Sequence, residues 1–241
     1  MSAYAALKET AWRCNMDLHA FALAVRTFGN ASAVDRARGV IAIKPSGVPY
    51  AELRPEMMVV VGLDNTVVEG SLRPSSDTRT HTLLYRQFGT IGGVVHTHSP
   101  YATAWAQARR SIPVFGTTHA DHLPEPIPCT APLADSAIRG DYEEETGNII
   151  VKTFARRSYV DVPMVLVAGH GPFAWGSTPE AAVENSVMLE ELAKMAYFTL
   201  TINPSARPLK RSLIDKHFRR KHGPGSYYGQ PREGRGKGEQ R

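Results

Sequence analysis

The sequence has little cysteine and no long hydrophobic run. Its 241 residues include only Cys14 and Cys129, neither in a Cys-x-x-Cys pair, which argues against a disulfide framework and against cysteine-based zinc or redox sites. No apolar run reaches the roughly 18 residues of a membrane-spanning helix. The N-terminal stretch mixes Lys8, Glu9 and Arg13 into its apolar residues, so it lacks the core of a secretory signal. We therefore expect a cytoplasmic protein.

Positive charge is concentrated towards the C-terminal end. The net charge is +5, but residues 207–241 hold 11 Lys and Arg against 3 Asp and Glu, so residues 1–206 are slightly acidic. Residues 231–241 are rich in glycine and charge, and we expect a basic, disordered extension there. A basic tail can bind nucleic acid, but no nucleic-acid module accompanies it. We therefore expect neither a nucleic-acid nor a membrane partner.

Segments with helical spacing alternate with short runs rich in valine and isoleucine, without a long linker or an internal repeat. This interleaving predicts one unit of the α/β or α+β class, with a central sheet covered by helices. The first two strands are expected to form an antiparallel meander, and residues 117–122 a polar loop. The expected helices are 4–27, 74–88, 100–109, one starting near Asp141, and 178–200; the expected strands are 39–43, 57–63, 91–99, 112–116, 148–154 and 163–171.

The most specific feature is the pair His96 and His98 at the end of an apolar strand. Side chains at i and i+2 of a strand point to the same face, so both imidazoles can reach one metal ion. His170, between Gly169 and Gly171 at the end of another expected strand, is a third candidate ligand. Three neutral imidazoles with an open position are typical of catalytic zinc, which polarises a carbonyl or lowers the pKa of a bound oxygen.

Asp77 has two interpretations, which the sequence leaves open. It lies at the start of the expected helix that precedes the His-x-His strand, so its carboxylate could contact or tune the metal. Together with Ser75 and Ser76, it also supplies the residue types that cap a helix N-terminus.

Three loops rich in small polar residues could bind a phosphate monoester. Backbone N–H groups at a helix N-terminus, helped by one lysine, can hold a phosphate. Each loop alone also fits an ordinary turn, and the lack of a GxxxxGK or GxGxxG motif argues against a nucleotide. The loops are Gly29-Asn30, Lys44-Pro45-Ser46-Gly47 and Pro74-Ser75-Ser76-Asp77.

A third polar cluster, residues 117–122, contains Asp121. An aspartate beside a metal-bound carbonyl compound would suit proton transfer. A polar cluster between apolar segments is equally typical of a plain loop, and periodicity does not choose between them. We interpret His19 and His81 as surface or packing residues.

A series of sequence strings, in order and with matching separations, resembles the family of class II aldolases and sugar-phosphate epimerases, and most of all its L-ribulose-5-phosphate 4-epimerases. The resemblance covers about residues 5–230 and implies one domain over residues 1–230. It implies a central, mainly antiparallel sheet covered by helices on both sides, and a homotetramer with active sites at subunit interfaces. The strings are FGNASAVD, IKPSGVPY, PSSDTRTH, GGVVHTHSPYATAWAQ, GTTHADH, IPCT, EETGNIIV, GHGPFAWG, DKHFRRKHG and YYGQ.

The resemblance also implies which residues bind metal and substrate. One Zn²⁺ per subunit would be held by His96, His98 and His170, with Asp77 at the position of a further ligand. The substrate, a small sugar phosphate, would meet a larger set of residues through its phosphate and hydroxyls. This set is Gly29, Asn30, Ser46, Gly47, Ser75 and Ser76.

Two further residues match the catalytic acid/base positions of the family. They are Asp121 and Tyr228, and the resemblance implies that Tyr228 reaches the site of a neighbouring subunit. His217 and Arg220 lie where the family's C-terminal segment completes the phosphate end of the site.

The implied activity is the interconversion of L-ribulose 5-phosphate and D-xylulose 5-phosphate, an isomerase reaction. The C4 hydrogen is not alpha to the C2 carbonyl, so simple deprotonation cannot invert C4. The family instead breaks the C3–C4 bond by retro-aldol cleavage, lets glycolaldehyde phosphate rotate and re-forms the bond, with Zn²⁺ as Lewis acid. The C4 oxygen loses its proton on one face and regains it on the other, so two acid/base groups are needed.

A class II sugar-phosphate aldolase, which releases the cleaved aldehyde, is the main alternative. The epimerases carry Asp at the position of Asp77, where the fuculose-phosphate aldolase carries Glu. A metal-free scaffold paralogue is disfavoured because the histidines, Asp121 and Tyr228 are all present. Nucleic-acid binding through the basic tail is the weakest alternative. The resemblance leaves open both the metal loaded in the cell and the pathway, whether arabinose catabolism, ascorbate or another sugar acid.

Overall fold

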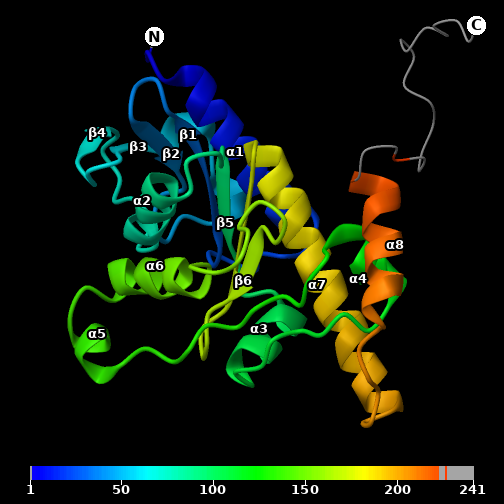
Figure 1. Ribbon diagram of the computed structural model, residues 1–241. Coiled ribbons are helices and arrows are strands. Elements are labelled where there is room, and N and C mark those ends of the chain that lie inside the picture. Colours follow the sequence, from blue (N-terminus) through cyan, green and yellow to red (C-terminus); the bar gives the residue numbers. More distant parts are fainter. Residues whose placement is uncertain (1, 223–225, 227–241) are drawn as a thin grey trace, which may run out of the picture.

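A computed structural model describes residues 2–222 and Ser226, and within them seven strands form one antiparallel sheet (Figure 1). The strand order is β4-β3-β2-β1-β5-β7-β6. The strands are β1 (Asn30–Asp35), β2 (Val40–Ile43), β3 (Val59–Gly62), β4 (Val67–Glu69), β5 (Gly93–His96), β6 (Met164–Leu166) and β7 (Pro172–Gly176). The helices are α1 (Ala5–Ala20), α2 (Thr78–Gln87), α3 (Pro100–Gln107), α4 (Thr117–His122), α5 (Asp135–Arg139), α6 (Tyr142–Thr153), α7 (Pro179–Ile202) and α8 (Arg211–His222), with short 3₁₀ turns η1 (Tyr50–Glu52) and η2 (Pro55–Met57).

Helices cover the sheet on both faces, which confirms the expected fold class. Side chains alternate along β1: Ala31 and Ala33 pack with α1, whereas the Ser32 hydroxyl contacts α2. The small alanines let α1 approach closely. On the other face α2 and α6 lie against each other, as Figure 1 shows.

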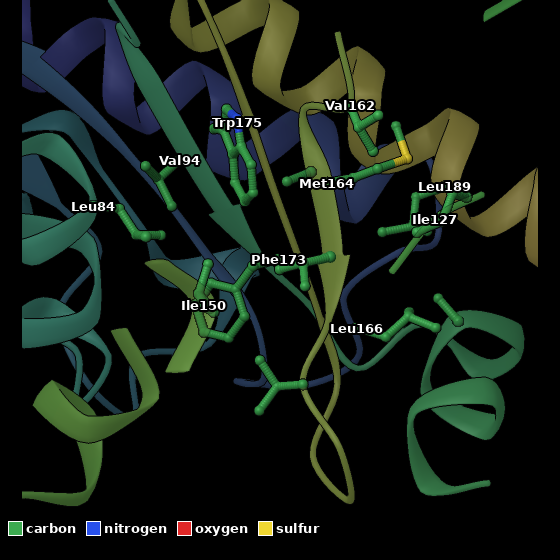
Figure 2. Close-up of a cluster of buried hydrophobic side chains, with 14 of the residues drawn as sticks. Leu84, Val94, Ile127, Ile150, Val162, Met164, Leu166, Phe173, Trp175 and Leu189 are labelled. Atoms are coloured by element: carbon green, nitrogen blue, oxygen red, sulfur yellow. The ribbon is translucent and has the colours of Figure 1, made fainter. Parts of the chain in front are cut away.

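The larger hydrophobic cluster fills the face that α2 and α6 cover and continues towards α3 and the middle of α7. Trp175 and Phe173 of β7 are aromatic members of this cluster, and Figure 2 shows them beside Val94 of β5 and Ile150 of α6. All four side chains are buried. Strands β5 and β7, which lead to the histidines, are therefore anchored in the larger hydrophobic cluster.

Asn15 forms a polar contact between α1 and β1, within the hydrophobic cluster that contains Ala31 and Ala33. Its side chain is fully buried, accepts a hydrogen bond of 2.9 Å from the Ala31 N–H and donates to the Ala31 carbonyl at 2.9 Å. Both backbone groups of Ala31 are thereby satisfied, and α1 is fixed in register against β1. This contact lies next to Asn30, one of the expected site residues.

Several expected elements agree with the structure. The strands at 39–43 and 57–63 correspond to β2 and β3, which pair antiparallel as expected for a meander. The strand at 91–99 contains β5, and the helices at 74–88, 100–109 and 178–200 contain or match α2, α3 and α7. The helix expected over 4–27 ends at Ala20, and the backbone of Ala22 has a positive φ of 56°.

Other expectations were wrong. Residues 148–154 belong almost entirely to α6, not to a strand, because Thr146, Gly147 and Ile150 are buried at helical spacing. Residues 112–116 form no strand, only an isolated bridge between Ile112 and Ile127. Residues 117–122 form α4 instead of a loop, and α8 packs against it. The segment 163–171 contains β6 and the turn that carries His170. Strands β1, β4 and β7 were not expected.

None of the helices in the described part of the chain has both the length and the apolar character needed to cross a membrane. The expected extension at 231–241 lies outside the described residues.

Candidate active site and metal centre

A cavity of about 360 Å³ opens where the ends of several strands meet three loops. Its volume is within the range of small-molecule sites. The metal and substrate residues expected from the sequence all line it, although they come from segments far apart in the chain. The lining is Thr27, Phe28, Gly29, Asn30, Lys44, Pro45, Ser46, Gly47, Ser75, Ser76, Asp77, His96, His98, Tyr142, Glu143 and His170.

Three histidines form a cluster in this cavity. One nitrogen of each of His96, His98 and His170 lies within 4.8 Å of the others. Nε2 of His96 and Nε2 of His98 are 3.1 Å apart. Two nitrogens bound tetrahedrally to one zinc ion lie about 3.3 Å apart, so this pair fits a shared metal ion.

In two of these histidines, His96 and His170, Nδ1 has a hydrogen-bond partner. Nδ1 of His96 lies 2.9 Å from the Pro172 carbonyl oxygen, which can only accept, so Nδ1 carries the proton and Nε2 is free. Nδ1 of His170 lies 3.1 Å from the Tyr142 hydroxyl. Burial lowers the pKa of His170 to about 4 and also lowers the pKa of His98. Near neutral pH these two imidazoles are uncharged, as metal ligands must be.

The structure separates the two interpretations of Asp77. It is the residue that precedes α2, but its side chain makes no capping hydrogen bond. Instead, Oδ2 accepts a hydrogen bond of 2.7 Å from Nδ2 of Asn30. Burial alone would raise the pKa of Asp77, but His96, His81 and the Asn30 hydrogen bond together hold it below its ordinary value. The carboxylate is therefore ionised and lies within the electrostatic reach of the histidines.

The backbone around the polar loops depends on glycine at two positions. Gly29 has φ of 78°, and a Cβ there would lie 3.1 Å from the His96 carbonyl oxygen. Gly47 has φ of 72° and lines the cavity, and a Cβ there would face open space. Lys44 is buried beneath this loop, and its Nζ donates to the Val48 carbonyl at 2.8 Å. Burial lowers the pKa of Lys44 to about 8.

Asp121 does not line this cavity. It lies on α4, where Oδ1 accepts a hydrogen bond from Arg220 at 2.8 Å and lies 2.9 Å from Nδ1 of His217. Burial raises its pKa, but the Arg220 and His217 contacts outweigh burial, so the pKa of Asp121 is lower than usual. Tyr228 lies outside the described residues. The structure thus brings Asp121, His217 and Arg220 together, and none of the three lines the cavity that holds the histidine cluster of the same chain.

Tyr142 is a cavity residue that no sequence pattern singled out. Its hydroxyl contacts His170, 28 positions further along the chain, and no spacing rule links the two residues. His81 is fully buried, with Nδ1 2.7 Å from the Ser32 hydroxyl, and burial lowers its pKa to about 3. His19 is exposed and stacks on Tyr50. Both histidines fit the packing or surface roles expected for them.

Comparison with known proteins identifies relatives of this chain. The family model described as the class II aldolase and adducin N-terminal domain matches residues 9–197. L-Ribulose-5-phosphate 4-epimerases UlaF of Salmonella paratyphi C (strain RKS4594) and Salmonella typhi are each 50% identical over 224 residues, covering 93% of this chain and 98% of the relative. These relatives are isomerases by name.

Solved structures give the same result at the level of the fold. An L-fuculose 1-phosphate aldolase superposes with a TM-score of 0.74 at 22% identity, covering 90% of this chain and 95% of that chain. The L-fuculose-1-phosphate aldolase of Thermus thermophilus has a TM-score of 0.63 at 25% identity, covering 84% and 98%. The chain therefore belongs to the class II aldolase and adducin N-terminal domain family, in which relatives at half identity are epimerases.

Proposed function

We propose that this protein interconverts L-ribulose 5-phosphate and D-xylulose 5-phosphate as a metal-dependent 4-epimerase. The observation that carries the proposal is the cluster of His96, His98 and His170 in a cavity whose rim is built from serine and glycine loops. A metal site beside a rim of serine and glycine loops suits a reaction that breaks and re-forms a carbon–carbon bond of a sugar phosphate. The epimerase relatives at 50% identity support this choice of substrate.

The residues present fit a divalent metal, and we propose zinc. His96, His98 and His170 would hold it, and Asp77 would complete or tune the site. Three neutral nitrogen donors are typical of catalytic zinc. When bound, the metal would supply Lewis-acid stabilisation of the negative charge that develops on the C2 and C3 oxygens during C3–C4 cleavage.

The remaining cavity residues would bind and orient the substrate. Ser46, Ser75 and Ser76 line the cavity, and their hydroxyls and backbone N–H groups would hold the phosphate. Asn30 has a buried Oδ1 without a partner among the described residues, so it can accept a hydrogen bond from a substrate hydroxyl. Its Nδ2 is already committed to Asp77.

Asp121 and Tyr228 are the proposed acid/base groups for the C4 oxygen. Because Asp121 does not line the cavity of its own chain, it would act in the cavity of another copy. Such a shared site is what the homotetramer implied by the family resemblance would provide. Arg220 and His217 would hold the Asp121 carboxylate ionised and oriented, ready to accept the proton from the C4 hydroxyl. The cytoplasmic location remains a prediction.

The test is to incubate metal-loaded and chelator-treated protein with L-ribulose 5-phosphate and to quantify D-xylulose 5-phosphate and free glycolaldehyde phosphate separately. Metal-dependent xylulose phosphate without free aldehyde is the expected result. Accumulating aldehyde would indicate an aldolase instead. A His98→Ala variant is the matched control, because it removes a proposed ligand at the edge of the cavity and should behave like the chelated protein.

A further inference from the structure

The hydroxyl of Tyr142 is the only side-chain group of the described residues within hydrogen-bond distance of His170. It lies 3.1 Å from Nδ1, and the ring centroids are 6.0 Å apart. Tyr142 itself lines the cavity. His96 shows the same arrangement with a backbone partner, because its Nδ1 lies 2.9 Å from the Pro172 carbonyl oxygen. Two histidines of the cluster thus have an external partner for Nδ1.

The direction of this hydrogen bond decides whether His170 can bind a metal through Nε2. A neutral imidazole carries one proton, and only the bare nitrogen can be a ligand. When Nδ1–H donates to the Tyr142 oxygen, Nε2 is bare. When the Tyr142 hydroxyl donates to Nδ1, Nε2 carries the proton and cannot bind a metal. A phenol oxygen can act as the acceptor that the ligand form of His170 needs.

Tyr142 is also held in place independently of His170. It begins α6, whose N-terminus is capped by the Asp141 side chain, which accepts from the Glu144 N–H at 3.2 Å. The Thr146 hydroxyl donates to the Tyr142 carbonyl at 2.8 Å. Asp141 also forms an ion pair with Arg79 of α2.

A second contact ties the same turn to α2, because the Thr80 hydroxyl donates to the Glu143 carbonyl at 2.5 Å. Arg79 and Thr80 lie two and three residues after Asp77. The start of α6 and the start of α2 are therefore fixed to each other beside the histidine cluster. A supporting group must be positioned this rigidly if it is to orient a metal ligand.

We propose that Tyr142 is a positioning residue for the metal centre: it accepts a hydrogen bond from Nδ1 of His170 and so holds Nε2 bare and directed at the ion. The inference rests on the metal centre of the proposed function and adds a residue that acts through His170. Partners of this kind change metal affinity about 10- to 100-fold when they are removed.

The test is the zinc affinity of Tyr142→Phe, measured by competition with a chelator on the full chain. The substitution keeps the ring and removes only the hydroxyl, so we expect zinc binding to weaken at least about 10-fold. Tyr159→Phe is the matched control. It also removes one tyrosine hydroxyl with one side-chain contact, 3.4 Å from Thr90, outside this cavity, and should leave zinc affinity unchanged.

A second readout separates positioning from a general loss of structure. Cobalt(II) bound in place of zinc should show a changed visible absorption spectrum in Tyr142→Phe and an unchanged one in Tyr159→Phe. The metal-free forms of both variants should unfold at the parent temperature. Should Tyr142→Phe unfold at a lower temperature, zinc affinity is compared at a temperature where every metal-free form is folded.

The outcomes distinguish this inference from the proposed function. One result would overturn the role of Tyr142 and leave the epimerase proposal standing. In that result the parent protein binds zinc, and Tyr142→Phe has the same zinc affinity and the same cobalt spectrum. Parent protein that binds zinc no better than His170→Ala would overturn the metal centre, and both proposals with it.

Discussion

Nδ2 of Asn30 donates a hydrogen bond of 2.7 Å to Oδ2 of Asp77, joining the first residue of β1 to the residue that precedes α2. The contact crosses 47 positions of sequence and lies in the lining of the cavity. It holds the ionised Asp77 carboxylate in the cavity and leaves Oδ1 of Asn30 without a partner among the described residues.

Replacing Asn30 by alanine removes this hydrogen bond and the proposed contact of Oδ1 with the substrate. Hydrogen bonds to charged groups contribute about 1.5–3 kcal/mol, so we expect kcat/KM for L-ribulose 5-phosphate to fall at least about 10-fold. Steady-state kinetics on the zinc-loaded variant measures this. Asn148→Ala changes an exposed asparagine of α6 and should leave kcat/KM unaltered. Equal kinetics for Asn30→Ala and the parent would exclude Asn30 from the substrate site.

The separation of Asp121 from the histidines predicts that two inactive variants restore activity when mixed. Asp121→Asn removes the acid/base group and His96→Ala removes a ligand, so each variant alone should lose nearly all turnover. In mixed assemblies some sites combine an intact Asp121 with an intact histidine cluster. Random mixing in equal amounts should restore on the order of a quarter of the parent activity.

The mixing measurement requires that subunits be unfolded and refolded together, with each variant refolded alone as the control. Activity that stays at the level of the separate variants would contradict a site shared between copies. Such a result would mean that Asp121 is not a catalytic residue, or that it acts in the site of its own chain.

Asn15 is predicted to contribute strongly to stability. Its fully buried side chain satisfies both backbone groups of Ala31, so Asn15→Ala leaves two buried polar groups without partners. We expect the free energy of unfolding to fall by about 2–4 kcal/mol. Urea denaturation followed by circular dichroism measures it. Asn148→Ala, on an exposed face, should change it by less than about 0.5 kcal/mol. Similar losses for both variants would contradict the anchoring role of Asn15.

His119 predicts a loss of stability in mild acid. It is buried on α4, and burial lowers its pKa from 6.5 to about 4. The unfolded chain therefore binds a proton before the folded one as the pH falls. The contribution of the neutral, buried His119 to the free energy of unfolding is complete above about pH 6.5 and is lost progressively down to about pH 4. From pH 7.5 to 5 this histidine should remove about 2 kcal/mol from the free energy of unfolding.

Urea denaturation of the parent and of His119→Gln at both pH values measures this contribution. The variant should lose less stability than the parent between the two values. His19→Gln, at an exposed position, should follow the parent. A parent and a His119→Gln variant with the same dependence on pH would show that His119 takes up its proton equally well in the folded protein.

The comparison of sequence with structure shows which signals are local. Strand alternation correctly predicted that His96 and His98 approach each other, although β5 ends at His96 and His98 follows it. The polar loops correctly predicted residues that meet around one cavity. The pattern of residues 148–154 wrongly predicted a strand, because Ile149, Ile150 and Val151 favour strands in a short window. The packing of α6 against α2 is a tertiary contact that such a window does not contain: Gly147 lies so close to Leu83 that a Cβ there would meet Leu83 at 3.2 Å.

The metal and loop residues could be predicted from local motifs, but the side-chain contacts between distant segments could not. His96 and His98 are neighbours in sequence, but the contact of Tyr142 with His170 exists only in the folded chain. The same is true of Asp77, whose side chain turns to Asn30 instead of capping α2. The ion pair of Asp121 with Arg220 depends on α8, which the sequence pattern did not predict.

The central claim is that the histidine cluster holds the metal that the 4-epimerase reaction requires. The most direct measurement is a titration of zinc into metal-free protein, with the rate of D-xylulose 5-phosphate formation recorded at each step. We expect no turnover by the metal-free protein and a rate that rises linearly until one zinc ion is bound per chain. Full turnover by the metal-free protein, or a rate unrelated to bound zinc, would contradict it.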